Sequence, residues 1–352
     1  MDLLHLTLSC MLSVFFSDAA IEPPTSTKSK NVTCTATTDL AVPIASNIMY
    51  QSKDGGQTWQ DISQALPIND QPEDFYAGET DLYMRIKDVI YQSKSKLATP
   101  VWEEVNNLDL KGASIAFNRS GVVAYNYDGR IYKKASTIDS WLPVYTSSQK
   151  HSLQSVFETT DGTLFLGSGN GLYKSADKGK SWKQVQREGW VMNIVESDGV
   201  LIGTGQKGIM RSIDKGEHWE WVISEGGVGI AVERIAQGFA AIVYNSAKEA
   251  RIIYTSMDNG KTWKNISNGL QPSPSISSIK QVGNFLLCGH PDGVFRSADM
   301  GKTWHMVHAG LAKKNFVFAQ LWNATNSNEP EKVFKLFVAG NVIYAVAVNS
   351  GC

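Results

Sequence analysis

A short pattern that recurs about every forty residues constrains this chain more than any other feature of its sequence. The pattern is Ser-x-Asp-x-Gly-x-(Thr/Ser/His)-Trp, here called the box, and it occurs in five good copies. These copies begin at Ser52, Ser175, Ser212, Ser256 and Ser297. Two degenerate copies, 93–102 and 136–141, fill the gap between the first and the second. Seven tryptophans thus recur at intervals of 37 to 44 residues: Trp59, Trp102, Trp141, Trp182, Trp219, Trp263 and Trp304.

The box lies between two short apolar runs in each repeat, which is the pattern of a strand, a turn and a second strand. A regular period near forty, with turn residues and an aromatic residue in each unit, favours a β-propeller. The unit before the second good box is the clearest, with strands expected at 153–158, 163–167, 171–175 and 181–185. We therefore predict an all-β fold, a seven-bladed β-propeller of four-stranded antiparallel blades.

The two ends of the repeat region each supply half a blade. The first hairpin, 47–62, carries a box but lacks two strands before it, and the runs 333–338 and 342–348 have no box after them. We expect the N-terminal hairpin to pair with the two C-terminal strands in one sheet, since closing the ring removes exposed strand edges. This placement brings Cys34 and Cys352 near the same blade, which makes a disulfide between them a hypothesis and leaves Cys288 as a core thiol.

Each residue type in the box has a structural use. The aspartate carboxylate can accept backbone N–H groups across its own turn, and the glycine can take positive φ without steric cost. The tryptophan carries a large apolar area that suits burial between sheets. We therefore assign the five good boxes a structural role rather than a binding role. Their key residues are Asp54, Asp177, Asp214, Asp258 and Asp299, with Trp59, Trp182, Trp219, Trp263 and Trp304.

These octapeptides resemble the Asp-box, also called the BNR repeat. That repeat occurs in sialidases, in some endoglucanases, in sortilin-type receptors and in the photosystem II stability and assembly factor family. The resemblance covers nearly the whole chain after residue 45. It implies a propeller whose boxes lie at the blade periphery, away from the functional face. The photosystem II branch implies a role in holding a membrane-protein precursor, but the basic patch of that branch has no identifiable counterpart here.

Composition and the N-terminal region set the expected organisation. The chain has 352 residues and a net charge of −1, so neither a basic excess nor a Lys/Arg block indicates nucleic acid as a partner. Residues 1–19 read as a signal peptide that is too short for a transmembrane anchor, and 20–45 as a flexible lead-in rich in Ser, Thr, Pro and Lys. The propeller then occupies 46–352. We expect a secreted or periplasmic monomer.

Candidate ligand-binding residues follow from the expected strand order. The box turn joins strands three and four, so the opposite face carries the turns between strands two and three and the connections between blades. Long loops on a rigid scaffold often carry function. The candidates on that face are Asp128, Arg187, Trp190, Lys207, His290, Asp292 and Trp322. Simpler readings remain open, because His290 and Asp292 fit a plain turn, Trp190 fits a core position, and Lys207 fits a solvated loop.

The chemistry of known enzyme classes finds little support in the sequence. A sialidase needs three arginines that clamp a carboxylate, but Arg211 and Arg296 stand directly before boxes, which is the wrong place for that role. Sialidases also resemble six-bladed rings, whereas seven blades are expected here. No His-x-x-x-His, Cys-x-x-Cys or phosphate-binding loop is present, so we predict no catalytic residue, no metal and no cofactor. We expect a non-catalytic module that binds a protein or a glycan on the face opposite the boxes. The alternative is a carbohydrate-active enzyme, sialidase-like or another glycoside hydrolase.

Overall fold

The computed structural model describes residues 47–67, 72–108, 110–135, 140–146, 153–307, 309–311 and 332–349. Residues Pro43–Cys352 form one compact unit, and all that follows concerns this unit. The predicted signal peptide, the lead-in and the hypothetical Cys34–Cys352 disulfide lie outside the described residues.

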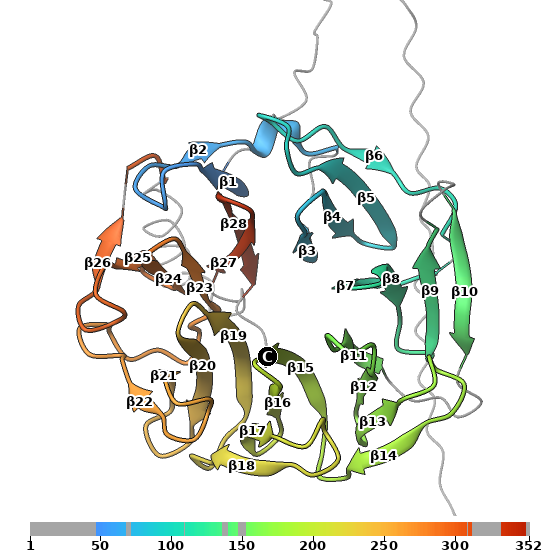
Figure 1. Cartoon of the computed structure of the whole chain (residues 1–352). Coiled ribbons are helices and arrows are strands. Elements are labelled where there is room, and N and C mark those ends of the chain that lie inside the picture. The colour runs from blue at the N-terminus through green and yellow to red at the C-terminus, as the bar shows by residue number, and fades with distance from the viewer. Residues whose placement is uncertain are drawn as a thin grey trace, which may run out of the picture. The chain divides into compact units, whose positions relative to one another are not determined.

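The described chain forms seven four-stranded antiparallel sheets arranged in a ring (Figure 1). The predicted seven-bladed β-propeller is therefore confirmed. In each blade the first strand lies nearest the axis of the ring and the fourth lies at the rim (Figure 1). One short 3₁₀ helix, η1 (Ser63–Ala65), follows the first hairpin.

We number the blades from the first complete one along the chain. Blade 1 has β3 (Asp74–Ala77), β4 (Asp81–Ile86), β5 (Val89–Lys94) and β6 (Glu103–Glu104). Blade 2 has β7 (Ser114–Asn118), β8 (Gly121–Tyr125), β9 (Arg130–Lys134) and β10 (Trp141–Thr146). Blade 3 has β11 (Leu153–Glu158), β12 (Leu164–Ser168), β13 (Gly171–Ser175) and β14 (Lys183–Gln186). Blade 4 has β15 (Val191–Ser197), β16 (Val200–Gly205), β17 (Gly208–Ser212) and β18 (Glu220–Ile223).

The remaining three blades complete the ring. Blade 5 has β19 (Gly229–Ile235), β20 (Gly238–Asn245), β21 (Ala250–Ser256) and β22 (Lys264–Asn265). Blade 6 has β23 (Ser278–Val282), β24 (Phe285–His290), β25 (Gly293–Ser297) and β26 (His305–Val307). Blade 7 combines β27 (Lys332–Ala339) and β28 (Val342–Asn349) with β1 (Met49–Ser52) and β2 (Gln60–Asp61).

Blade 7 closes the ring in the way the sequence predicts. Strand β1 pairs antiparallel with β28, with Met49 opposite Val346 and Ser52 opposite Ile343. The backbone N–H of Ala347 also donates to the carbonyl of Ile48 at 2.8 Å. The two ends of the chain are thereby joined in one sheet, which leaves no blade of the ring incomplete.

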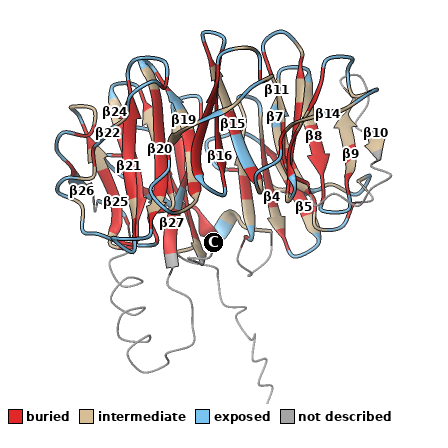
Figure 2. Cartoon of the chain, turned by 90° about the horizontal axis from the view of Figure 1, so that it is seen from below, coloured by how far each residue is buried: buried red, intermediate tan, exposed pale blue. Residues whose placement is uncertain are grey.

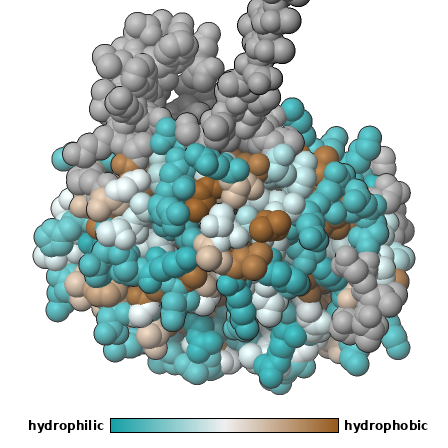
Figure 3. Space-filling view, turned by 90° about the horizontal axis from the view of Figure 1, so that it is seen from above, coloured by the Kyte–Doolittle hydropathy of each residue, from teal (hydrophilic) through white to brown (hydrophobic). Residues whose placement is uncertain are grey.

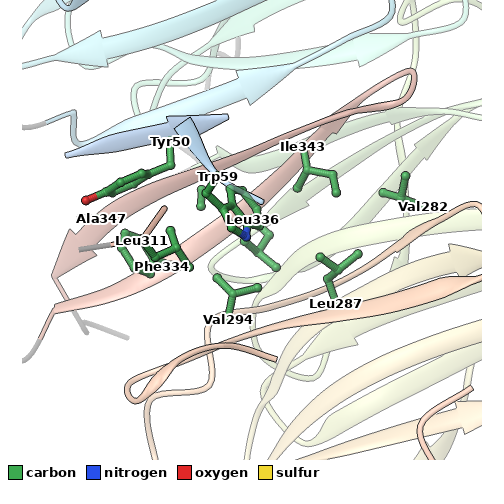
Figure 4. Packing of buried hydrophobic residues seen from close by; sticks show 11 residues of the cluster. Tyr50, Trp59, Val282, Leu287, Val294, Leu311, Phe334, Leu336, Ile343 and Ala347 are labelled. Atoms are coloured by element: carbon green, nitrogen blue, oxygen red, sulfur yellow. The ribbon is translucent and has the colours of Figure 1, made fainter. Parts of the chain in front are cut away.

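The hydrophobic core lies between neighbouring blades, and buried strands run through the middle of the ring while exposed turns cap both ends (Figure 2). At the seam between blades 6 and 7, Trp59 packs among Leu287, Val294 and Leu336 (Figure 4). The other tryptophans of the repeat likewise join core clusters with residues of the preceding blade, Trp219 beside Phe165 and Trp304 beside Ile266. Each box tryptophan therefore fastens its blade to the blade before it.

The box turn is held by its own aspartate and serine. In the blade 6 box, Asp299 Oδ1 accepts the backbone N–H of Thr303 at 2.9 Å, and Asp299 Oδ2 accepts the hydroxyl of Thr303 at 2.7 Å. Ser297 Oγ accepts the N–H of Gly301 at 2.8 Å. The same aspartate bonds recur around Asp54, Asp177 and Asp258, and around Asp214 the Nδ1 atom of His218 takes the place of the hydroxyl.

In blades 3, 4 and 6, the residue before the box serine ties its blade to the box of the next blade. Arg211 Nε donates to the carbonyl of Asn259 at 2.7 Å, and Arg296 Nε donates to the carbonyl of Gly55 at 3.0 Å. Lys174 reaches Glu217 at 2.6 Å in the same way. These three cationic side chains lie on the third strands of their blades, away from the innermost strands, and each bonds to a box turn.

The box glycine combines two constraints. Gly216 has a φ of +77°, and a Cβ atom placed on it would lie 2.4 Å from Cζ of Phe165 in the preceding blade. Gly179 has a φ of +86°, but there the nearest atom would be Cζ2 of its own Trp182, at 3.5 Å. The two positions thus share the backbone constraint and differ in the steric one.

We expect Gly216→Ala to destabilise the protein more than Gly179→Ala. Positive φ costs a non-glycine residue about 1–2 kcal/mol, and overpacking a core adds about 1–3 kcal/mol. Only Gly216→Ala should incur both costs. Urea-induced unfolding of the two variants measures the difference. Equal destabilisation would show that the glycine is required by its backbone conformation alone.

The box aspartates also predict an acid-sensitive stability. Ser181 lowers the pKa of Asp177 from 3.8 to about 2, mainly through the hydrogen bond of its hydroxyl and then through that of its backbone N–H. Because the folded pKa is the lower one, this contribution is complete above the unfolded value and is lost as the pH falls from about 4 toward 2. Asp177→Asn should therefore lose less thermal stability than the wild type between pH 5 and pH 2.5. Asp88→Asn, in the exposed β4–β5 turn, serves as the control and should follow the wild type.

Candidate functional site

The strand order divides the turns of the propeller between two faces. The box turns and the turns between first and second strands lie on one face, here called the box face. The turns between second and third strands and the connections between blades lie on the other, here called the loop face. The described ends of blade 7, Asn47 and Asn349, also belong to the loop face.

A group of charged and aromatic residues gathers on the loop face where blades 3 and 4 meet. Glu188, in the connection from β14 to β15, accepts bonds from Lys207 Nζ at 2.9 Å and from the indole N–H of Trp221 at 3.0 Å. Arg187 and Trp190 flank Glu188 in the same connection. We call these five residues the tryptophan cluster.

The tryptophan cluster rests on a close packing of backbone segments. The N–H of Gln206 donates to the carbonyl of Trp190 at 3.2 Å, which joins the connection to the β16–β17 turn. A Cβ atom on Gly189 would lie 2.0 Å from Oε1 of Gln206, and one on Gly205 would lie 2.8 Å from Cη2 of Trp221. Glycine at these two positions therefore lets the connection and the Trp221 ring lie directly against β16.

The tryptophan cluster is polar and open to solvent. The side chains of Lys207 and Glu188 are 56% and 54% exposed, and Arg187 is exposed as well. Trp190 and Trp221 are partly exposed. The hydrogen bond from Lys207, then that from Trp221, lowers the pKa of Glu188, so this carboxylate stays ionised near neutral pH. Both charge signs are thus presented beside the indole of Trp221, with Trp190 in the same connection as Glu188.

A second polar group lies on the innermost strands. Arg85 pairs with both Glu73 and Asp74 at the loop-face end of β3 and β4. Burial, and then the charge of Asp74, raises the pKa of Tyr76, while a hydrogen bond with Ser114 acts in the opposite direction. Lys280 on β23 pairs with Glu233 on β19 at 2.6 Å. The innermost strands therefore carry paired charges rather than a continuous apolar lining.

Lys335 on β27 differs from these paired groups. It is exposed to solvent. Partial desolvation lowers the pKa of its ammonium group; the carboxylate of Asp74 raises that pKa, and the nearby Lys280 lowers it further. Its Nζ lies 5.7 Å from the ring centroid of Phe337.

The described candidate residues from the sequence lie in three places on the loop face: the tryptophan cluster, the β8–β9 turn and the β24–β25 turn. Arg187, Trp190 and Lys207 come together in the tryptophan cluster. Asp128 is exposed in the β8–β9 turn, where the side chain of Asn126 contacts it at 3.3 Å. Trp322 lies outside the described residues.

His290 and Asp292 form the β24–β25 turn on the loop face. The Nε2 atom of His290 contacts the carbonyl of Gln271 at 2.9 Å, and its Nδ1 atom accepts the N–H of Asp292 at 3.1 Å. The His290 side chain is 2% exposed. These contacts use both ring nitrogens of the histidine, Nδ1 within the turn and Nε2 with the connection between blades 5 and 6.

Sequence reasoning did not select Trp221, Tyr76 or Lys335. A signal for Trp221 exists, because it follows the box tryptophan Trp219 by two residues. The alternation of a strand therefore puts both indoles on one side of β18, and both pack in the same core cluster. No local signal marks Lys335, whose position depends on how the ring closes.

The arginines of the chain do not share one location. Arg211 and Arg296 hold box turns, and Arg119 and Arg234 lie toward the box face. The other four lie on the loop face, each in a different blade: Arg85, Arg130, Arg187 and Arg251. Of these, Arg85, Arg130 and Arg251 contact groups of their own blade or of the neighbouring loop.

The described residues contain no group of three or more His, Cys, Asp or Glu side chains with metal-binding geometry. Large exposed apolar side chains are scattered over several blades, among them Val101, Ile213 and Met257. Figure 3 shows one side of the surface, which is mostly hydrophilic with small apolar patches. Within the described ranges, no helix has the length and apolar character needed to cross a lipid bilayer.

Comparisons with known proteins identify the fold alone. No family model and no curated protein matches the sequence. Among solved structures, the GH74 xyloglucanase from Xanthomonas campestris is 15% identical with a TM-score of 0.57 over 75% of this chain, but the match covers only 53% of the xyloglucanase. YCF48 bound to a D1 peptide is 14% identical with a TM-score of 0.52, over 81% of this chain and 95% of YCF48.

Two further similar structures widen the range of activities. The extracellular domain of a putative one-component system from B. thetaiotaomicron is 12% identical with a TM-score of 0.57, over 71% of this chain and 36% of that one. An oligogalacturonate lyase from Vibrio parahaemolyticus is 10% identical with a TM-score of 0.52, over 87% of this chain and 97% of the lyase. This chain is similar in fold to propellers with different activities.

We expect Lys335 to be unusually reactive toward acylating reagents. Its lowered pKa leaves more free amine at pH 8 than the same side chain would have at its ordinary pKa. Peptide mass spectrometry after brief acetylation measures the rate at Lys335 in the wild type and in two variants. Asp74→Asn should raise the rate at Lys335, because it removes a charge that raises this pKa, and Lys280→Met should lower it. The opposite order of the two variants would contradict the assignment.

Proposed function

We propose that this propeller is a non-catalytic recognition module that binds a protein or glycan ligand on its loop face. The observation that carries the proposal is the tryptophan cluster, in which Glu188 bonds to Lys207 and Trp221, and Arg187 and Trp190 lie in the same connection as Glu188. On the box face, the aspartate, serine and threonine of the box turns bond to one another, which gives these groups a structural role.

The chemistry of the tryptophan cluster suits recognition. A partly exposed indole can stack on the face of a sugar ring or cover the side chain of a peptide, and tryptophan and arginine are enriched among residues that dominate binding energy. The ammonium of Lys207 and the carboxylate of Glu188 can each bond to hydroxyl or amide groups. Because the cluster is fixed to β16 by backbone packing, little ordering is needed when a ligand arrives.

The carboxyl groups with a resolved pKa shift give no support to hydrolysis. A glycoside hydrolase needs one carboxylic acid that holds its proton near neutral pH beside a second, ionised carboxylate. Every described Asp and Glu with a resolved shift has a lowered pKa, including Glu188 in the cluster. None of them is thus poised as a proton donor. The structures similar in fold include a xyloglucanase and YCF48 bound to a peptide, so both a glycan and a protein are candidate ligands.

Binding assays with matched variants test the proposal. A glycan array and a pull-down from the source cells, run in parallel, identify the ligand class. Trp190→Ala should then weaken binding at least about tenfold, as is common for a buried aromatic anchor, and Glu188→Gln and Lys207→Met should weaken it less. Lys302→Met on the box face is the control and should bind as the wild type does.

Two outcomes would contradict this function. Turnover of a sialoside or polysaccharide by the wild-type chain would support the carbohydrate-active alternative. Loss of binding in Lys302→Met, with unchanged binding in Trp190→Ala, would move the ligand to the box face.

The expected location, secreted or periplasmic, belongs to the same proposal and rests on the predicted signal peptide. N-terminal sequencing of the exported protein should find Ala20 as its first residue. An intact N-terminus on protein recovered from the cytosol would contradict export.

A further inference from the structure

The seam between blades 2 and 3 contains a cavity with apolar inner walls. The cavity has a volume of about 310 Å³. Its inner walls are Val123, Ile131, Val156 and Leu166, which are between 3% and 9% exposed and belong to the core between the two blades. Volumes from about 300 Å³ are typical of small-molecule sites. We call this space the seam cavity.

The missing bulk has an identifiable origin. At other seams the box glycine lies against a large side chain of the preceding blade. A Cβ atom added to Gly216 would lie 2.4 Å from Phe165, and one added to Gly260 would lie 2.5 Å from Ile202. The box glycine of blade 3, Gly179, has no atom of blade 2 within 4 Å of such a Cβ. From β8, alternation turns Gly121 and Val123 toward this seam, and both are smaller than phenylalanine.

The rim of the cavity is cationic. Lys133 on β9 and Lys178 in the blade 3 box line the opening, and neither ammonium has an acceptor within the described part of the chain. The one carboxylate at the rim, Glu158, already accepts the backbone N–H of Ser120 at 2.9 Å. The indole of Trp182 forms part of the wall, and its N–H is bonded to the carbonyl of Gly179 at 3.2 Å.

We propose that the seam cavity binds a small amphiphilic anion, a molecule with an apolar body and a single carboxylate head. The apolar body replaces the side chain that blade 2 lacks and contacts Val123, Val156 and Leu166. The carboxylate lies at the rim and pairs with Lys133 and Lys178. This site is on the box-face side of the ring and is separate from the tryptophan cluster on the loop face.

Calorimetric titration with three probes of equal chain length tests the charge requirement. Decanoate should bind with one molecule per chain, while decanol and decyltrimethylammonium should bind more weakly, in that order. Failure of decanoate to bind, or binding of all three with equal affinity, would overturn the proposal.

Variants of the rim test the position of the head group without disturbing the core. Lys178→Met is compatible with the box turn, because Met300 occupies the corresponding position of the blade 6 box with a φ of 59°. Lys133→Met and Lys178→Met should each weaken decanoate binding up to about fivefold, as expected for an exposed ion pair. Lys180→Met, in the same box but outside the cavity lining, should bind as the wild type does. Equal affinities in all three variants would overturn the assignment of the head group.

A filled cavity tests the position of the apolar body. Val123→Phe restores bulk on β8 and should abolish decanoate binding, with circular dichroism used to confirm that the fold is retained. Retained decanoate binding in the folded Val123→Phe protein would place the ligand elsewhere and overturn the proposal. If Val123→Phe does not fold, the rim variants decide the question. None of these residues belongs to the loop face, so the outcome is independent of the function proposed for that face.

Discussion

Packing of one blade against the blade before it is the interaction on which this structure depends. No single sheet of four short strands has a core of its own, and the buried side chains lie between sheets. The box concentrates this packing at one point of each repeat, because its tryptophan meets the preceding blade. At several seams the box glycine meets that blade as well, as Gly216 meets Phe165. Replacing a buried tryptophan by alanine typically costs about 3–5 kcal/mol. Of the seven repeat tryptophans, Trp59, Trp141 and Trp304 are buried and the other four are partly exposed, so the seven contacts around the ring differ in strength.

The sequence contained most of this architecture. The period of the tryptophans predicted the number of blades, and the half-blades at the two ends predicted that β1 and β2 complete the sheet of β27 and β28. These features are local or periodic, so spacing alone reveals them. Contacts between blades are not local. Nothing near Arg211 or Arg296 in the sequence shows that each cation reaches the box of the next blade.

The candidate site was predicted less completely, for a related reason. Arg187, Trp190 and Lys207 could be assigned to the loop face because strand order alone places them there. Their association with Trp221 through Glu188 depends on the register of β18 and on two glycines that let the chain approach β16. Lys335 owes its environment to Asp74 and Lys280, which come from other blades. Topology therefore predicts which face a residue occupies, and tertiary packing decides which residues act together.

The sheet shared by the two ends of the chain has a consequence for biosynthesis. A ribosome adds about 5–20 residues per second, so the hairpin of β1 and β2 is made roughly 15 to 60 s before its partners β27 and β28. Throughout that interval the edge of β1 that will pair with β28 is available to other strands, including those of a neighbouring nascent chain. Exposed strand edges of this kind template intermolecular pairing. Cells that make this protein must keep its earliest strands apart from foreign edges until translation ends.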